Sequence, residues 1–200
     1  MAGVQVGRVE RGPGRPRQEH VTGAVLSAVL ELVAEQGLAA VTMDAVAARA
    51  GVSKPAIYRR WPGKHDLVIA AAETRVGVLA VPDLGDFRAE LRAVLDARLD
   101  VYRIPGTARL LAGLIAAVQE AGEVRGAYQR YVSRTMGETR KILERGIARG
   151  DVRADIDVQS AATLVAAPLI FRLVIEQQLP DERFAADLTD MIARAVGSPA

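Results

Sequence analysis

Residues 25–67 read VLSAVLELVAEQGLAAVTMDAVAARAGVSKPAIYRRWPGKHDL, and this stretch decides the fold. Together with the residues just before it, its first part carries apolar side chains at helical spacing, at Val21, Val25, Ala28, Val29 and Leu32. Apolar residues that recur three and four positions apart lie on one face of an α-helix. We therefore predict a helix from about Glu19 to Gln36, with Gly37 as its C-terminal stop.

Two short helices are predicted next. Thr42 is placed to cap a helix over 43–50, and Ser53 to cap a second over 54–60. A hydroxyl at such a position accepts a hydrogen bond from a free backbone N–H group of the first turn. Gly51 supplies the tight turn between the two helices. Two short helices joined by a glycine-containing turn have the outline of a helix-turn-helix.

The second short helix has the side chains that reading DNA requires. Small apolar residues of the first helix, with Ile57 from the second, provide an inner packing face. Lys54, Tyr58 and Arg59 are then left pointing outward. In a helix-turn-helix the second helix enters the major groove, where such side chains meet base edges and phosphates.

The same stretch resembles the DNA-binding domain of the TetR family of transcriptional regulators, without gaps. The matching positions are Gly37, Thr42, Ala47, Ala50 to Ser53, Tyr58, Trp61, Lys64 and Leu67. The turn Gly150 to Arg153, followed by Asp155 to Asp157, is also similar to one in that family. The resemblance implies an all-α fold: an N-terminal three-helix helix-turn-helix domain and a C-terminal helical bundle, about nine helices in all.

The resemblance also assigns roles at the DNA. It places Thr42, Ser53, Tyr58, Lys64 and Arg60 at phosphates, and Lys54, Pro55, Tyr58 and Arg59 at base edges. Lys and Arg can reach guanine O6 and N7 in the major groove. Taken singly, these residues are equally explained as helix caps, surface charge or a core ring. Ala56 stands where many members have a polar residue, and Arg59 where some have an aromatic one, so the base preference does not transfer.

Residues 1–18 form a separate segment with no apolar periodicity, and we predict a flexible basic arm. Arg15 and Arg17 flank a proline and follow Gly14, which resembles the core of an AT-hook. An extended arm of this kind can lie in the narrow minor groove, whose negative potential attracts arginine. A disordered solubilising tail is the alternative.

The remaining sequence predicts helices throughout. The expected spans are 64–78, 86–103, 107–120, 123–149, 157–178 and 181–196. We divide the chain into the arm, a DNA-binding domain at 19–65, and a helical ligand-binding and dimerisation domain at 66–200. Pro168 should kink the helix that contains it, because proline removes one backbone hydrogen bond.

By resemblance, the C-terminal domain should hold a ligand and form a homodimer. Apolar residues of its first helices are expected to enclose an unknown small-molecule effector that is hydrophobic or weakly polar; the candidates are Leu95, Leu99, Tyr102, Leu110, Leu114, Val118, Tyr128, Tyr131, Met136 and Phe171. Stripes along the last two helices are expected to pair across a two-fold axis, at Ala162, Val165, Leu169, Leu173, Gln177, Phe184, Leu188, Ile192 and Val196. All of these residues could equally fill the domain's own core.

Composition excludes several other classes. The chain has no cysteine and two histidines far apart, so we expect no thiolate chemistry, no metal site and no cofactor. No apolar stretch is long enough to predict a membrane span, and no secretory signal is recognisable, which favours the cytoplasm. The best interpretation is a repressor released from a palindromic operator in double-stranded DNA. The alternatives are a ligand-independent regulator or adaptor on the same scaffold, and, least favoured, a helical enzyme.

Overall fold

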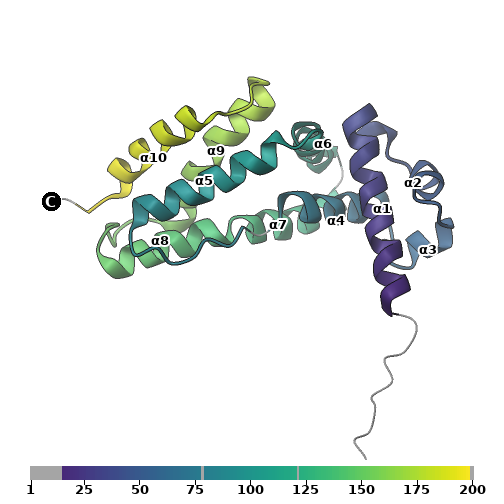
Figure 1. Ribbon diagram of the computed structural model, residues 1–200, viewed down its shortest axis with the longest axis horizontal. Helices are drawn as coiled ribbons and strands as arrows, with labels where there is room; N and C mark the ends of the chain where they lie inside the picture. The colour runs from purple at the N-terminus through teal and green to yellow at the C-terminus, as the bar shows by residue number, and fades with distance from the viewer. Residues whose placement is uncertain (1–14, 78, 121, 199–200) are drawn as a thin grey trace, which may run out of the picture.

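The computed structural model describes residues 15–77, 79–120 and 122–198, and it is all-α as predicted (Figure 1). In the described residues the only strand-like pairing is an isolated bridge between Val152 and Gly197. The elements in chain order are α1 (Arg15–Gln36), the 3-10 helix η1 (Leu38–Ala40), α2 (Met43–Ala50), α3 (Lys54–Tyr58), α4 (Lys64–Val76), α5 (Phe87–Arg103), α6 (Thr107–Glu120), α7 (Gly122–Thr135), α8 (Gly137–Arg149), α9 (Val158–Ile170), the π-helical turn η2 (Phe171–Ile175) and α10 (Glu182–Val196).

Side-chain caps fix where several of these helices begin. The Thr42 hydroxyl accepts a hydrogen bond from the backbone N–H of Ala45 at 3.1 Å. Carboxylates of Asp86, Asp157 and Asp181 accept from the backbone N–H three residues later at 2.7–2.8 Å. Capping satisfies backbone donors that have no partner within the helix. Ser53 occupies the corresponding position before α3, but its side chain makes no capping hydrogen bond, contrary to the prediction.

Helix α1 begins four residues earlier than predicted. It starts at Arg15, so the last four residues of the predicted arm have helical backbone. Proline is tolerated in a first helical turn, where its missing N–H is not needed, so Pro16 does not prevent the early start. Residues 1–14 of the predicted arm lie outside the described residues.

The predicted helix 123–149 is two helices, which brings the number of α-helices in the described residues to ten. Helix α7 ends at Thr135, whose carbonyl oxygen accepts a hydrogen bond from the Arg98 guanidinium at 3.2 Å. Helix α8 begins at Gly137, and glycine is a poor helix former. The break therefore lies where the buried arginine contacts the last carbonyl of α7.

The predicted helix 157–178 also ends early and changes its geometry. Pro168 lies inside α9, and three residues later the helix widens into the turn η2. There the backbone N–H of Glu176 donates to the carbonyl of Phe171, the five-residue spacing of a π-helix. Gln177 then takes a positive φ of 54° and ends the segment.

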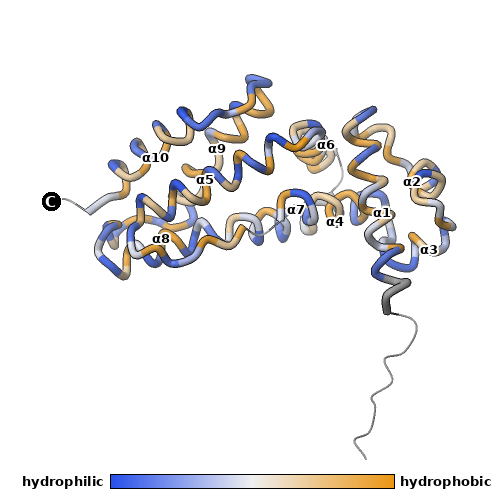
Figure 2. The backbone as a smooth tube through the Cα atoms, viewed as in Figure 1, coloured by the Kyte–Doolittle hydropathy of each residue, from blue (hydrophilic) through white to orange (hydrophobic). Residues whose placement is uncertain are grey.

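One apolar core connects the DNA-binding helices with the rest of the chain. It includes Val25 and Val29 of α1, Leu67 and Ala71 of α4, and Leu95 of α5, each no more than 1% exposed. Apolar segments line the inner sides of the helices, as the hydropathy colouring shows (Figure 2). Helix α4 crosses the domain boundary predicted at residue 65, so the two domains share a helix.

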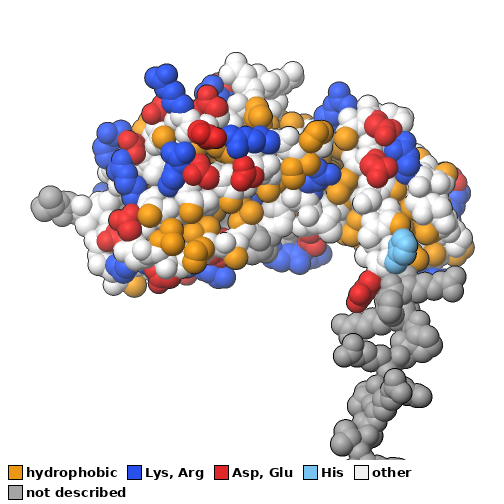
Figure 3. All heavy atoms as spheres, viewed as in Figure 1, with side chains coloured by type: hydrophobic (Ala, Val, Ile, Leu, Met, Phe, Trp, Pro, Cys, Tyr) orange, Lys and Arg blue, Asp and Glu red, His pale blue; other side chains and the backbone are white. Residues whose placement is uncertain are grey.

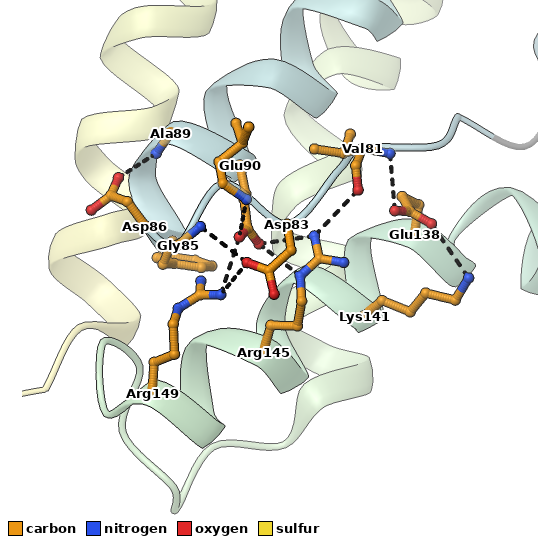
Figure 4. Close-up of polar contacts among 12 residues, drawn as sticks. Val81, Asp83, Gly85, Asp86, Ala89, Glu90, Glu138, Lys141, Arg145 and Arg149 are labelled. Carbon is orange, nitrogen blue, oxygen red and sulfur yellow. Dashed lines mark hydrogen bonds and ion pairs between the residues drawn. The ribbon is translucent and has the colours of Figure 1, made fainter.

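The connection between α4 and α5 is fastened to α8 by buried charges (Figure 4). Glu90 is 0% exposed, and its carboxylate binds Arg145 at 2.9 Å, Arg149 at 3.1 Å and the backbone N–H of Leu84 at 3.1 Å. Glu138 of α8 accepts a hydrogen bond from the backbone N–H of Val81 at 3.0 Å. Backbone groups that would otherwise be unpaired are thus satisfied from α5 and α8.

Residues 158–175 are the one helical stretch of the described chain that is long and apolar enough to cross a membrane by length and composition. The stretch contains Arg172, and its inward residues Ala162, Val165 and Leu169 are buried in the domain core. Core helices share this composition, so the stretch is explained by packing. Its outward side also carries exposed apolar residues, among them Leu164, Phe171 and Ile175.

Candidate DNA interface and ligand cavity

Helices α2 and α3 form the predicted helix-turn-helix. Gly51 ends α2 in the left-handed region, at φ 65° and ψ 33°, a conformation that glycine adopts without strain. The backbone N–H of Val52 donates to the carbonyl of Ala47 at 3.1 Å and closes the turn. Ile57 on the inner side of α3 is fully buried, and Trp61 just after it is buried in the same core. Burial on one side fixes which side of α3 faces solvent.

The structure brings the predicted DNA-contacting residues of this unit to one region of the surface. Thr42, Ser53, Lys54, Pro55, Tyr58 and Arg59 are exposed, and Arg60 and Lys64 are half-buried. Tyr58 leaves half of its surface in solvent, although a ring of that size is usually better covered. Arg15 and Arg17 belong to the first turn of α1, which precedes the helix-turn-helix in the sequence.

Hydrogen bonds already occupy part of this surface. Lys54 forms an ion pair with Asp44 across the two short helices, and this contact raises the pKa of the Lys54 ammonium. Arg60 donates to the carbonyl of Ala56 at 3.3 Å, which holds the guanidinium near the end of α3. The Thr42 hydroxyl accepts the capping hydrogen bond of α2, whereas the Ser53 hydroxyl makes no capping hydrogen bond.

A cavity of about 170 Å³ lies within the C-terminal domain. Residues from α4, α5, α6, α7, α8 and α9 line it, and they are overwhelmingly apolar. The lining residues are Val76, Val94, Leu95, Arg98, Tyr102, Leu111, Ile115, Tyr128, Tyr131, Val132, Thr135, Met136, Thr139, Val165, Ala166, Leu169 and Ile170. Because α4 contributes Val76, the cavity is bounded by the helix that continues from the DNA-binding unit.

Five of the predicted ligand residues line this cavity: Leu95, Tyr102, Tyr128, Tyr131 and Met136. The other five do not. Leu99, Leu110 and Leu114 are buried elsewhere in the core, Val118 is half-buried, and Phe171 is 55% exposed on η2. Helical periodicity identifies an inward face, but it does not separate the part of that face that meets a void from the part that meets another helix.

Arg98 is the functional candidate that the sequence reading missed. It lies on the buried face of α5, between Leu91 and Tyr102 at helical spacing, and only 7% of its surface is exposed. Its guanidinium donates to the carbonyl of Val76 at 3.3 Å and to that of Thr135 at 3.2 Å. The sequence signal for it was the position of Arg98 as the one charge in that part of an otherwise apolar helical face.

A second missed contact joins α6 to α1. Arg109 donates to the carbonyl of Ala34 at 2.6 Å and to that of Glu35 at 3.3 Å, so it caps the C-terminal end of α1. Gly106 approaches the same turn so closely that a Cβ atom there would lie 2.6 Å from the Cβ of Ala34. These contacts connect the cavity domain directly to the DNA-binding helices.

The stripes predicted for the dimer are mostly buried within the single chain, which corrects that assignment. Leu188, Ile192 and Val196 of α10 are 1–4% exposed, as are Val165 and Leu169 of α9. Ala162 and Leu173 are buried too, Phe184 is half-buried, and Gln177 is exposed. The alternative reading, that these residues fill the domain's own core, is the correct one for nearly all of them.

Other apolar side chains of the same two helices do face solvent. Leu164, Phe171 and Ile175 follow one another at helical spacing along α9 and η2, and they are 45%, 55% and 64% exposed. Met191 of α10 is 52% exposed. On the face shown in Figure 3, acidic and basic side chains are interspersed over α5 and α10. We refer to Leu164, Phe171, Ile175 and Met191 as the apolar patch.

An all-helical chain with an exposed helix-turn-helix and an apolar cavity has the architecture of a DNA-binding transcriptional regulator. In the described residues no group of three or more His, Cys, Asp or Glu side chains could hold a metal ion. Two family descriptions match. Residues 25–71 match "Bacterial regulatory proteins, tetR family", and residues 81–192 match "Tetracyclin repressor-like, C-terminal domain".

Individual proteins agree with these matches. The uncharacterized HTH-type transcriptional regulator YdeS of Bacillus subtilis is 32% identical over 88% of this chain and 89% of its own length. The DNA-binding transcriptional repressor TetR of Mycobacteroides abscessus is 30% identical over 87% and 92%. The crystal structure of the TetR family transcription regulator SCO0332 superposes with a TM-score of 0.70, at 32% identity over 88% and 98%. The chain belongs to the TetR family of transcriptional regulators, which is a DNA-binding and not an enzyme family.

Proposed function

We propose that this protein is a homodimeric repressor that binds a palindromic operator and is released by a small effector in the α4–α9 cavity. The observation that carries the proposal is the cluster of exposed side chains on α2 and α3, held by a buried inner face. The name of the M. abscessus relative supports repression in particular. The protein acts in the cytoplasm with the chromosome, and it needs no cofactor or catalytic step.

Within the operator, α3 reads base edges and the surrounding residues hold the backbone. Lys54, Pro55, Tyr58 and Arg59 face the bases in this proposal, because they are exposed on the side of α3 opposite Ile57. Thr42, Ser53, Arg60 and Lys64 flank that face and contact phosphates. The Lys54–Asp44 ion pair must open for Lys54 to reach a base, since one ammonium cannot satisfy both at full strength.

The dimer forms through the apolar patch, in place of the stripes first predicted. A helix that is apolar on all sides is normally buried on all sides, and α9 with η2 is buried by its own chain on one side only. A second copy related by a two-fold axis would cover the outward residues and bring two α3 helices to the two half-sites of a palindrome. The patch lies on the last two helices, as expected of the dimer.

Ligand controls the equilibrium between two conformations of the dimer. The cavity touches α4 at Val76, and α4 follows directly from the helix-turn-helix, so a ligand that reshapes the cavity can alter the spacing of the two α3 helices. Operator DNA must then weaken ligand binding by the same factor by which ligand weakens DNA binding. The presence of a cavity favours this mechanism over a ligand-independent regulator or adaptor.

The function is tested by selecting bound duplexes from a random DNA library. We expect an enriched palindromic or near-palindromic site, with log affinity falling by about 0.9 per log unit of salt for each phosphate neutralised. Lys64→Ala should reduce that slope and weaken all sequences alike. Lys141→Ala is the matched control, because Lys141 is an exposed lysine of α8 that lies outside the proposed DNA interface. Failure to retain any duplex in a salt-sensitive way would refute the function.

The dimer surface is tested separately with Ile175→Glu. A carboxylate within an apolar two-fold contact appears twice and repels its own copy. We expect folded helical monomers by sedimentation, with weakened operator binding because each half-site is then held alone. Gln129→Glu, which adds the same single negative charge at an exposed position of α7, controls for net charge. A variant dimer with full operator affinity would rule out the apolar patch as the interface.

A further inference from the structure

The polar groups of the cavity are few, and the charged one has an unusual environment. Arg98 is the one charged side chain among the described residues that line the cavity. No carboxylate of the described chain forms an ion pair with it; its two hydrogen bonds go to the carbonyls of Val76 and Thr135, the last residues of α4 and α7. Helix C-termini carry only about half a negative charge each. The guanidinium therefore has donors and charge available to a ligand.

Tyr131 adds a second polar group to the cavity, a buried phenol hydroxyl. Its side chain is only 4% exposed, and its buried hydroxyl makes no hydrogen bond of normal geometry, although the Thr135 side chain lies close enough to interact weakly with it. Burial raises the pKa of Tyr131, so the phenol keeps its proton at neutral pH and remains a donor. Buried hydroxyls without partners are unfavourable, and a native structure that contains one calls for an explanation. A ligand atom that accepts a hydrogen bond would supply it.

The size of the cavity limits the ligand. An engineered protein cavity of about 150 Å³ binds benzene, and the cavity here, at about 170 Å³, is only slightly larger. A single ring or a compact branched chain with a short polar group fills such a space. The surrounding valine, leucine and isoleucine side chains favour an apolar body for the ligand.

We infer that the effector is a small carboxylic acid with a compact apolar body, bound with its carboxylate between the Arg98 guanidinium and the Tyr131 hydroxyl. This inference rests on the proposed function for its regulatory meaning and on the cavity alone for the chemistry. A neutral apolar ligand would fill the volume but leave the Arg98 charge without a counter-ion and the Tyr131 hydroxyl without a hydrogen-bond acceptor. A carboxylate satisfies both, through charge-assisted hydrogen bonds that are stronger than those to a carbonyl.

The position of Arg98 also explains how such an acid would act on DNA binding. The guanidinium that would bind the carboxylate also holds the last carbonyl of α4, at Val76. A carboxylate bound to the free N–H groups draws the guanidinium toward itself and weakens its hydrogen bond to this carbonyl, so the bound acid loosens the end of α4. The other end of α4 begins at Lys64, next to the helix-turn-helix. The acid thus favours the conformation in which α4 is free to move.

The chemistry is tested with acids and their neutral amides of the same shape, in the full-length protein at neutral pH. The probes are benzoate with benzamide and cyclohexanecarboxylate with cyclohexanecarboxamide, measured by thermal shift and titration calorimetry. Hydrogen bonds to charged groups correspond to roughly tenfold to hundredfold in affinity, so we expect each acid to bind at least about tenfold more tightly than its amide. Equal binding within the pairs, or no binding by either acid, would overturn the inference.

Two variants identify the residues. Tyr131→Phe removes only the hydroxyl, which makes no hydrogen bond of normal geometry, so the fold should be kept while the acids weaken by about tenfold and the amides change little. Arg98→Met should abolish the preference for acids; circular dichroism establishes whether it folds, and Arg98→Lys, which keeps the charge, should retain part of the preference. If the folded Tyr131→Phe variant kept the full preference for acids, Tyr131 would not be a ligand-binding residue. If the folded Arg98→Met variant kept that preference, the carboxylate site proposed in the cavity would be refuted.

Operator binding separates this inference from the proposed function. Acid binding by a protein that retains no duplex from the library would refute the repressor and leave the cavity chemistry intact. A selected operator that is bound normally, with no preference for acids over amides, would refute the cavity chemistry and leave the repressor intact. If both hold, saturating acid should weaken operator binding, and Tyr131→Phe should shift that response to higher acid concentration.

Discussion

Replacing Glu90 by Gln should destabilise the protein strongly, although the change removes no volume. The carboxylate is 0% exposed and binds Arg145, Arg149 and the backbone N–H of Leu84. Removing one partner of a buried ion pair costs about 3–5 kcal/mol, because it leaves charge without compensation. The two arginine side chains are 24% exposed and keep some solvation, and Arg149 retains ion pairs with Asp83 and Asp151, which favours the lower end, about 3 kcal/mol. That is a large part of the 5–15 kcal/mol that stabilises a typical protein.

Thermal and urea unfolding, at one protein concentration for all variants, measure the effect. For a chain of this length about 3 kcal/mol corresponds to a fall of roughly 6–12 °C in Tm. Asp96→Asn is the matched control, since it removes an exposed carboxylate that pairs with Arg92 on the same helix; such pairs are worth about 0.2–1 kcal/mol. If Glu90→Gln lowered Tm no more than Asp96→Asn does, the buried network would not be what fastens the α4–α5 connection.

Three further predictions concern DNA reading, the α1–α6 contact and alkaline stability. Arg59→Ala should relax the selected operator at one position per half-site, at about 1–3 kcal/mol each; equal weakening of all sequences would make Arg59 a phosphate contact. Gly37 and Gly106 both have a positive φ, of 83° and 85°, but only at Gly106 would a Cβ lie against α1. Gly37→Ala should lower the free energy of unfolding by roughly 1 kcal/mol, and Gly106→Ala by more, as measured by urea unfolding. Burial raises the pKa of Tyr131 above its ordinary value of 10.0. Its contribution to stability is therefore fully present below pH 10 and lost as pH rises further, and Tyr131→Phe should flatten the alkaline fall in Tm; an unchanged slope would contradict this.

Most of the fold could be predicted from the sequence because it depends on local signals. Helical periodicity and capping residues located α2, α5, α6 and α10 to within about a residue at each end. The helix-turn-helix was recognisable because its requirements are local: a cap at Thr42, a left-handed glycine at Gly51 and an inward Ile57. The exposed positions on α3 followed from the same periodicity.

The errors arose where residues distant in sequence decide the structure. The break between α7 and α8 lies at the contact with Arg98 of α5, thirty-seven positions before Thr135. The dimer stripes were misplaced because α9 is apolar on both sides, and periodicity does not indicate which side a neighbouring helix of the same chain will cover. Half of the predicted ligand residues do not line the cavity for a related reason, since a cavity is a property of several helices together.

The close contact of α6 with α1 has a consequence for how such a regulator can evolve. Gly106, Arg109 and Gly113 face the DNA-binding helices, and at both glycines a Cβ would lie within 2.8 Å of an atom of α1 or η1. Leu111 and Ile115 of the same helix face the cavity instead. Substitutions at the second set can therefore change what is bound, while the two glycines of the first set, which leave no room for a larger side chain, preserve the contact with the DNA-binding helices. New ligand preferences are accessible by mutation within a single helix, without rebuilding the path from ligand to DNA.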